Sequence, residues 1–199
     1  MLGIPAPRLK HLYRLSAYCS ENLLLSEHAA ITLATEAKTN VAWPDMAISL
    51  ALRPLLDQAV NTLAPLFVLY GIVQKLGLGL ETVKYSVYRL LGDPSDPRTL
   101  SETLVRVRIL SIIRQIRSHV PSRRYRSIRN TILRRVRRNR RHHSVYISGK
   151  TYLLPLVHLQ LKKVAGLNDS FDHVKVRLAQ HCELTIDRGL HRALRKAVK

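Results

Sequence analysis

The chain has 199 residues, 46% of them apolar, and a formal net charge of +20 at pH 7. This apolar content excludes a disordered tail, and the length suits one domain or two small ones. Such a large positive net charge predicts a polyanionic partner, because like charges repel one another when a chain compacts.

The first part of the chain is typical of helices that face a core. Leu and Ala recur at helical spacing over residues 9–15 and 23–37, which predicts two helices. Pro44, Pro54 and Pro65 then interrupt an apolar stretch, and a proline fits the first turn of a helix but disrupts its interior. Either a series of short helices or one kinked helix satisfies this pattern.

The apolar residues within 46–80 raise the question of a membrane. Asp57 and Lys75 bracket seventeen uncharged residues, whereas a helix needs about 20 apolar residues to span a bilayer. Gln58 and Asn61 also interrupt the run. We therefore expect a buried core helix, and membrane association through residues 46–80 is the weaker alternative.

A stretch rich in turn-forming residues follows. Residues 81–91 predict an amphipathic helix that stops at Gly92, and two Asp-Pro pairs predict a linker over 93–99. Thr99 and Glu102 have the spacing of a capping box at the start of the next helix. We therefore place a boundary here, between a helical lobe of residues 1–92 and a second lobe of residues 100–199.

The two halves of the chain differ in charge. Residues 1–100 hold 9 Lys and Arg against 8 Asp and Glu, whereas residues 101–199 hold 24 against 5. Residues 103–168 contain 17 Lys and Arg and no acid. Residues 123–141 form an Arg-rich segment with ten arginines and no lysine. Arginine binds phosphate through two parallel hydrogen bonds and stacks on bases, which favours a nucleic acid over lipid as the partner.

The basic lobe also predicts helices. Residues 100–119 have apolar side chains on one face and arginines on others, and Pro121 ends the pattern. Residues 123–141 have only a narrow apolar stripe, and two further helices are predicted over 171–182 and 187–198. The expected fold class is mainly α.

Gly149, Lys150 and Thr151 have the sequence that ends a nucleotide-binding P-loop. That motif requires a glycine where Ser144 stands, and a buried strand before it, so we reject nucleotide hydrolysis. β-forming residues flank the glycine on both sides, which predicts a β-hairpin over residues 145–154 in the basic lobe.

Metal and catalytic sites find little support. The histidines and cysteines lack the spacing of a zinc site. No His-Glu-x-x-His or Gly-x-Ser-x-Gly motif occurs in the sequence. We therefore expect no cofactor and no enzymatic activity. Cys19 and Cys182 are too few for a disulfide framework, which favours an intracellular protein. The start of the chain has no acidic residue before Glu21, which is typical of a mitochondrial presequence, and the arginine cluster is typical of a nuclear localisation patch.

The acid-free, basic stretch of residues 103–168 predicts that the basic lobe has a nucleic-acid interface. The predicted contacts are Arg114, Arg117, Arg123, Arg124, Arg126, Arg129, Arg134, Arg135, Arg137, Arg138, Arg140, Arg141, Lys150, Lys162 and Lys163. Tyr125, Tyr146 and Tyr152 lie within or beside this run and are candidates for stacking on unpaired bases, which is more typical of RNA than of duplex DNA. Each of the three tyrosines fits a core residue equally well.

Two functions fit these features. The first is an RNA-binding structural component of a ribonucleoprotein, such as a ribosome or an organellar ribosome, whose 1–92 lobe contacts protein neighbours. The alternative is a viral or accessory protein that binds nucleic acid or an anionic membrane. Leu, Arg and Ser are abundant, as expected of a reading frame that overlaps another gene, and this bias favours the alternative.

Overall fold

The computed structural model describes residues 24–37, 42–78, 86–138 and 147–182, and the described part is mainly helical, as predicted. Side chains are described for all of these residues except 135–138. The elements are α1 (Glu27–Glu36), α2 (Pro44–Leu76), the 3-10 turn η3 (Val87–Leu90), α3 (Glu102–His119), α4 (Ser122–Arg138), the π-helical turn η5 (Gly149–Leu153), α5 (Leu154–Ala165) and α6 (Phe171–His181).

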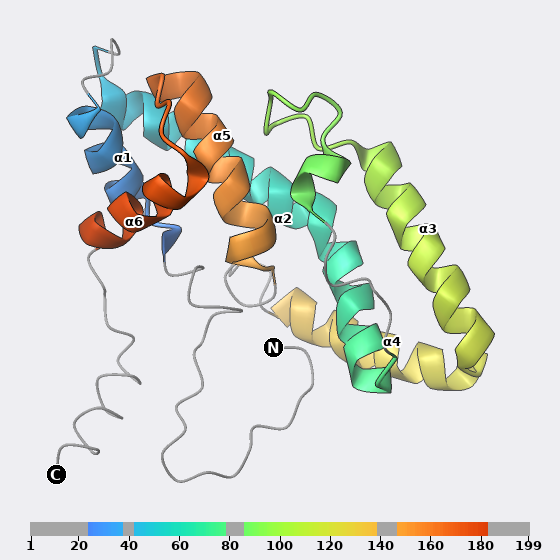
Figure 1. Ribbon diagram of the computed structural model, residues 1–199. Helices are drawn as coiled ribbons and strands as arrows, with labels where there is room; N and C mark the ends of the chain where they lie inside the picture. The colour runs from blue at the N-terminus through green and yellow to red at the C-terminus, as the bar shows by residue number, and fades with distance from the viewer. Residues whose placement is uncertain (1–23, 38–41, 79–85, 139–146, 183–199) are drawn as a thin grey trace, which may run out of the picture.

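The long helix α2 runs through the middle of the molecule (Figure 1). Its 33 residues form one helix, although Pro54 and Pro65 lie inside it. The two prolines are eleven residues apart, which is about three helical turns, and both are exposed, so the helix side that faces the core is not interrupted. The helix ends at Gly77, whose φ of 66° is a left-handed conformation that favours glycine.

Among the described helices, α2 is long and apolar enough to cross a membrane. Its most apolar window has a mean hydropathy of 1.3, and 56% of that window is buried inside the protein. Such burial is typical of a core helix, because side chains that face other helices cannot face lipid at the same time.

Two clusters of buried side chains form the core, one at each end of α2. The first half of α2 packs with α1, α5 and α6 through residues such as Leu33, Ile48 and Leu161. The second half packs with η3, α3, α4 and η5, and this cluster includes Phe67 and Ile112. Both clusters therefore draw on both halves of the chain, and the packing does not follow the predicted boundary between lobes at residues 93–99.

The predicted β-hairpin is absent from the described part of residues 145–154. Residues 149–153 form η5 and lead directly into α5, while residues 145 and 146 lie outside the described residues. Ser148 explains the difference, because its hydroxyl accepts a hydrogen bond from the backbone N–H of Thr151 at 3.3 Å. Its carbonyl accepts from Tyr152 and Leu153, so the backbone donors that a strand would use are engaged in a helical turn.

The start of α3 is capped by Ser101, not by the predicted Thr99. The Ser101 hydroxyl accepts a hydrogen bond from the backbone N–H of Leu104 at 3.2 Å. The Thr99 hydroxyl instead donates to the carbonyl of Asp96 at 2.7 Å, which stabilises the preceding turn.

We expect Ser101→Ala to lower the free energy of unfolding by about 1 kcal/mol, because it removes the cap of α3. Urea denaturation followed by circular dichroism measures this change. Thr103→Ala, at an exposed position of the same turn, is the control and should have a much smaller effect. An equal effect of the two substitutions would contradict the assignment of Ser101 as the cap.

Candidate nucleic-acid interface

Helix α3 divides its side chains between the core and the solvent. Val105, Ile112 and Ile116 are buried against α2, and they recur at helical spacing. Arg114 and Arg117 lie on the exposed side. The helix stops at His119 and Pro121 follows, so the chain turns sharply into α4 (Figure 1).

Helix α4 crosses α2 and has a narrow apolar stripe. Ile132 is 1% exposed, and Tyr125, Ile128 and Leu133 are partly buried against the same cluster. Five arginines of α4 are exposed around this stripe: Arg123, Arg124, Arg126, Arg129 and Arg134. Burial of the stripe against α2 therefore fixes the directions in which these arginines point.

We call the exposed arginines of these two helices the arginine surface. It consists of Arg114, Arg117, Arg123, Arg124, Arg126, Arg129 and Arg134. All seven were predicted as contacts, and the fold brings them together at one end of the molecule. Arg106 is also exposed on α3 and was not predicted as a contact, although it belongs to the same acid-free run.

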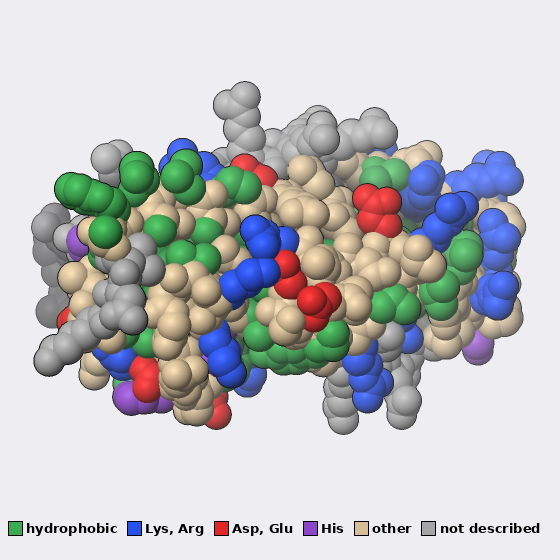
Figure 2. All heavy atoms as spheres, turned by 90° about the horizontal axis from the view of Figure 1, so that it is seen from above, with side chains coloured by type: hydrophobic (Ala, Val, Ile, Leu, Met, Phe, Trp, Pro, Cys, Tyr) green, Lys and Arg blue, Asp and Glu red, His purple; other side chains and the backbone are tan. Residues whose placement is uncertain are grey.

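Within the part of the chain that the structure describes, no residue of the arginine surface forms an ion pair. The ion pairs involve α1, α2, α5, α6 and the turn of residues 93–99 instead. Figure 2 shows Lys and Arg side chains gathered at the end where α3 lies, while acidic and basic side chains touch in the middle of the molecule. Among the described side chains, the excess positive charge is therefore concentrated on α3 and α4.

Two acidic residues near α6 have cationic partners within the fold. Arg177 of α6 contacts Glu36 at 3.0 Å and Asp169 at 2.8 Å, and this arrangement joins α6 to α1. Hydrogen bonds from Arg177 and then from His181 hold the pKa of Glu36 below its usual range. These carboxylates are engaged by their neighbours and do not neutralise the arginine surface.

The three predicted lysine contacts do not join the arginine surface. Lys163 of α5 forms an ion pair with Asp96 at 2.6 Å, so its charge is used within the fold. Lys150 is exposed on η5 and Lys162 on α5. The pKa of Asp172 is lowered first by a hydrogen bond from Lys175 and, to a smaller extent, by the charge of Lys150.

Tyr152 does not have its predicted role in base stacking. Tyr152 is 2% exposed, and its ring packs edge-on against Phe67 with the centroids 4.9 Å apart. Its hydroxyl lies 3.2 Å from that of Tyr70. Tyr152 therefore cannot stack on a base. The prediction of base stacking was wrong for this residue because its ring is buried against the apolar surface of α2. Tyr125 is half-buried in the stripe of α4.

Six of the predicted contacts lie outside the described side chains. Arg135, Arg137 and Arg138 belong to the last turn of α4, but their side chains are outside the described part. Arg140, Arg141 and Tyr146 lie outside the described residues.

Asp96 connects the turn of residues 93–99 to α5. Its carboxylate accepts hydrogen bonds from the Arg98 side chain at 3.2 Å and from Lys163 at 2.6 Å, and only 14% of the side chain is exposed. These cations, Arg98 first, hold the pKa of Asp96 well below its usual range. The charged carboxylate is therefore more stable in the folded chain than in the unfolded chain.

We expect Asp96→Asn to lower the free energy of unfolding at pH 7 by about 1–2 kcal/mol, because two charge-assisted hydrogen bonds lose their acceptor charge. The stabilisation is complete above the unfolded pKa of about 3.9 and is lost as pH falls through the lower folded pKa. Urea denaturation of both proteins at pH 7 and at successively lower pH should show the difference shrinking. A difference that is independent of pH would contradict this origin.

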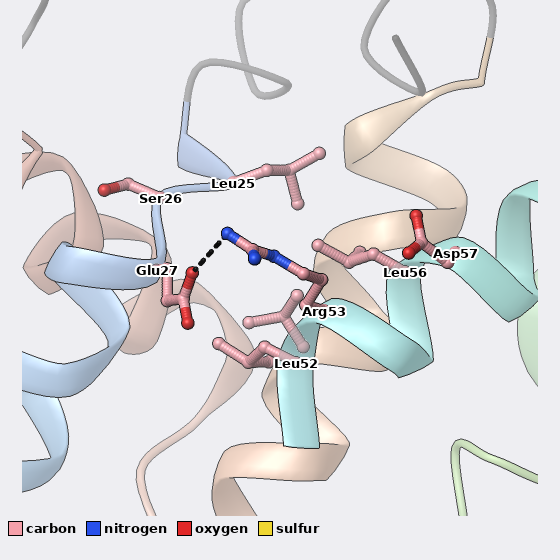
Figure 3. A pocket seen from close by; sticks show the side chains of 8 residues that line it. Leu25, Ser26, Glu27, Leu52, Arg53, Leu56 and Asp57 are labelled. Atoms are coloured by element: carbon pink, nitrogen blue, oxygen red, sulfur yellow. Dashed lines mark ion pairs between the residues drawn. The ribbon is translucent and has the colours of Figure 1, made fainter. Parts of the chain in front are cut away.

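A cavity of about 290 Å³ lies between α1, α2 and α5. Aliphatic side chains such as Leu52 and Leu56 line it, and Arg53 reaches toward Glu27 across it, 3.7 Å away (Figure 3). Ser26 also lines it, but its hydroxyl caps α1 by accepting from Ala29. Among these lining residues no nucleophile is hydrogen-bonded to a general base.

Within the described ranges, no group of three or more His, Cys, Asp and Glu side chains is arranged to hold a metal ion. Comparisons with protein-family models, with curated proteins and with solved structures found no match to this chain.

Proposed function

We propose that the chain is a non-enzymatic, RNA-binding structural protein, most plainly a component of a ribonucleoprotein such as a ribosome or an organellar ribosome. The observation that carries this proposal is the arginine surface, where seven exposed arginines on two adjoining helices have no acidic partner among the described residues. Each of these guanidinium groups has hydrogen-bond donors available for phosphate oxygens.

The charge arrangement supports a polymeric anion as the partner. Like charges on α3 and α4 repel one another, and a row of phosphates relieves this repulsion at several arginines together. Binding also releases the counterions that surround a nucleic acid, and this release makes the affinity depend steeply on salt.

A second surface supports membership in a larger assembly. Trp43 and Leu50 are 69% and 71% exposed, and Met46 is 58% exposed, at the start of α2. These three side chains recur at helical spacing on the outer side of α2, on the end of the molecule opposite the arginine surface. We propose that protein neighbours contact this apolar surface while RNA contacts α3 and α4.

The test is purification of the full chain at about 100 mM salt, followed by a 260/280 nm absorbance ratio and digestion with RNase or DNase. RNA that co-purifies and is released as salt rises is the expected result. A protein that elutes free of nucleic acid and does not shift an RNA probe at low salt would overturn the proposal.

The alternative function is a viral or accessory protein that binds nucleic acid or an anionic membrane. The exposed Trp43, Met46 and Leu50 favour it, because aromatic and aliphatic side chains on one side of a helix can insert into a lipid interface. Flotation with vesicles of anionic lipid separates the two functions when the arginines of residues 123–141 are replaced by glutamine. Flotation that persists while RNA binding is lost supports the alternative.

A further inference from the structure

The arginines of α4 point in several directions around the helix axis. An α-helix advances about 100° per residue, so Arg123 and Arg134 point within about 20° of each other and away from the buried Ile132. On the same count Arg124 lies about 100° to one side of Arg123, and Arg129 lies about 120° to the other side. The exposed arginines therefore occupy both flanks of α4 as well as its outer edge.

The outer edge itself holds short polar residues between the arginines. Ser127 and Asn130 are exposed there, at positions between Arg123 and Arg134 in the sequence. Short side chains at this edge let the helix approach a surface closely, and their polar groups can hydrogen-bond to phosphates or to ribose hydroxyls. Helix α4 thus presents short polar side chains along its outer edge and arginines on both flanks. We call this arrangement a ridge.

The aromatic side chains available in this part of the structure do not face the same surface. Tyr152 is buried, and Tyr125 is half-buried in the stripe that packs on α2. Proteins that hold single strands stack successive bases on aromatic rings, and each stacked base contributes about 1–3 kcal/mol. The described surface of α4 instead offers guanidinium groups, which bind phosphates.

We propose that α4 binds double-stranded RNA, with its two flanks contacting the phosphates of the two strands. This inference rests on the proposed RNA-binding function and names the class of RNA. A duplex presents two rows of phosphates on either side of a groove, which match cations on two flanks, whereas a single strand presents one row. The A-form minor groove is wide and shallow and displays ribose hydroxyls, so a ridge of this kind can reach both strands there without reading bases.

The experiment uses the full-length protein and fluorescence anisotropy. The probes are an RNA duplex of about 20 base pairs, its two separated strands, and a DNA duplex of the same sequence, since duplex-binding modules span about 16 base pairs. The RNA duplex is expected to bind at least tenfold more tightly than either strand and more tightly than the DNA duplex. Stronger binding of a single strand or of DNA would overturn the inference.

Variants of the two flanks give a second, independent result. Arg124→Gln removes a cation from one flank, and Arg129→Gln removes one from the other. Both variants should lose affinity for the RNA duplex by a similar factor, of about fivefold at low salt, because each removes a phosphate contact of about 1 kcal/mol.

A loss confined to one flank would overturn the two-strand geometry while leaving RNA binding intact. Failure of every probe to bind the unaltered protein would overturn the proposed function itself. Circular dichroism and thermal denaturation check that these surface variants remain folded, and a folded variant that loses affinity has lost it through the missing cation.

Discussion

Replacement of Arg123, Arg126 and Arg129 by glutamine in one variant is expected to lower the affinity for RNA about a hundredfold at low salt. All three side chains are exposed on α4 and have no acidic partner among the described residues. A hydrogen bond makes a net contribution of about 1 kcal/mol, and a hydrogen bond to a charged group contributes more. Loss of three such contacts therefore costs about 3 kcal/mol or more, which corresponds to a loss of affinity of at least about a hundredfold.

The salt dependence of the same variant tests the mechanism. The logarithm of the affinity falls with the logarithm of the salt concentration, with a slope of about −0.7 to −0.9 for each phosphate that is neutralised. Loss of three contacts should therefore make the slope shallower by about two to three. Because phosphate contacts carry no sequence information, the loss should be similar for probes of different sequence.

A charge-matched variant is the control. Replacement of Arg53, Lys75 and Lys175 by glutamine removes the same net charge from positions outside the arginine surface, on α2 and α6. Anisotropy titrations of both variants at several salt concentrations should show a much smaller loss for the control. Equal losses would mean that binding depends on net charge alone and that α4 is not the interface.

Local features of the fold could be predicted because their signals lie close together in the sequence. The periodic apolar residues of 100–119 predicted α3, and the helix predicted over 171–182 is α6, which Ser170 caps. The exposure of the arginines on α3 and α4 followed from the same periodicity, since a helix with few apolar residues buries only its narrow stripe.

Other features could not be predicted because they depend on residues far apart in the chain. Asp96 and Lys163 are 67 positions apart, so no local pattern indicates that this lysine is used within the fold. Tyr152 and Tyr70 meet across 82 positions. The β-forming residues after Gly149 indicated a strand, but burial of Tyr152 against α2 and the cap from Ser148 outweigh that local preference.

Phe67→Ala is expected to be the most destabilising single substitution in the core. Phe67 is 2% exposed and packs edge-on against Tyr70 and Tyr152, with centroid distances of 5.3 and 4.9 Å. Truncation of a buried phenylalanine costs about 3–5 kcal/mol, because transfer free energy is lost and a cavity remains. In a chain of this size the melting temperature should fall by roughly 10 °C.

Leu50→Ala is the matched control for that substitution. Leu50 lies on the same helix and is 71% exposed, so its truncation should change the free energy of unfolding by about 0.5 kcal/mol or less. Tyr152→Phe tests the adjoining hydroxyl pair and should cost about 1 kcal/mol. Urea and thermal denaturation of the three variants, followed by circular dichroism, give the comparison.

The Phe67 cluster also determines whether the arginine surface forms, because α3 and α4 pack on it through Ile112 and Ile132. Under conditions where Phe67→Ala is partly unfolded, RNA affinity should fall with the folded fraction, and it should recover on cooling toward the temperature of maximum stability. The arginine variant should instead keep its melting temperature and lose affinity at every temperature. If Phe67→Ala proved as stable as Leu50→Ala, the packing of α4 on α2 would not be what orients these arginines.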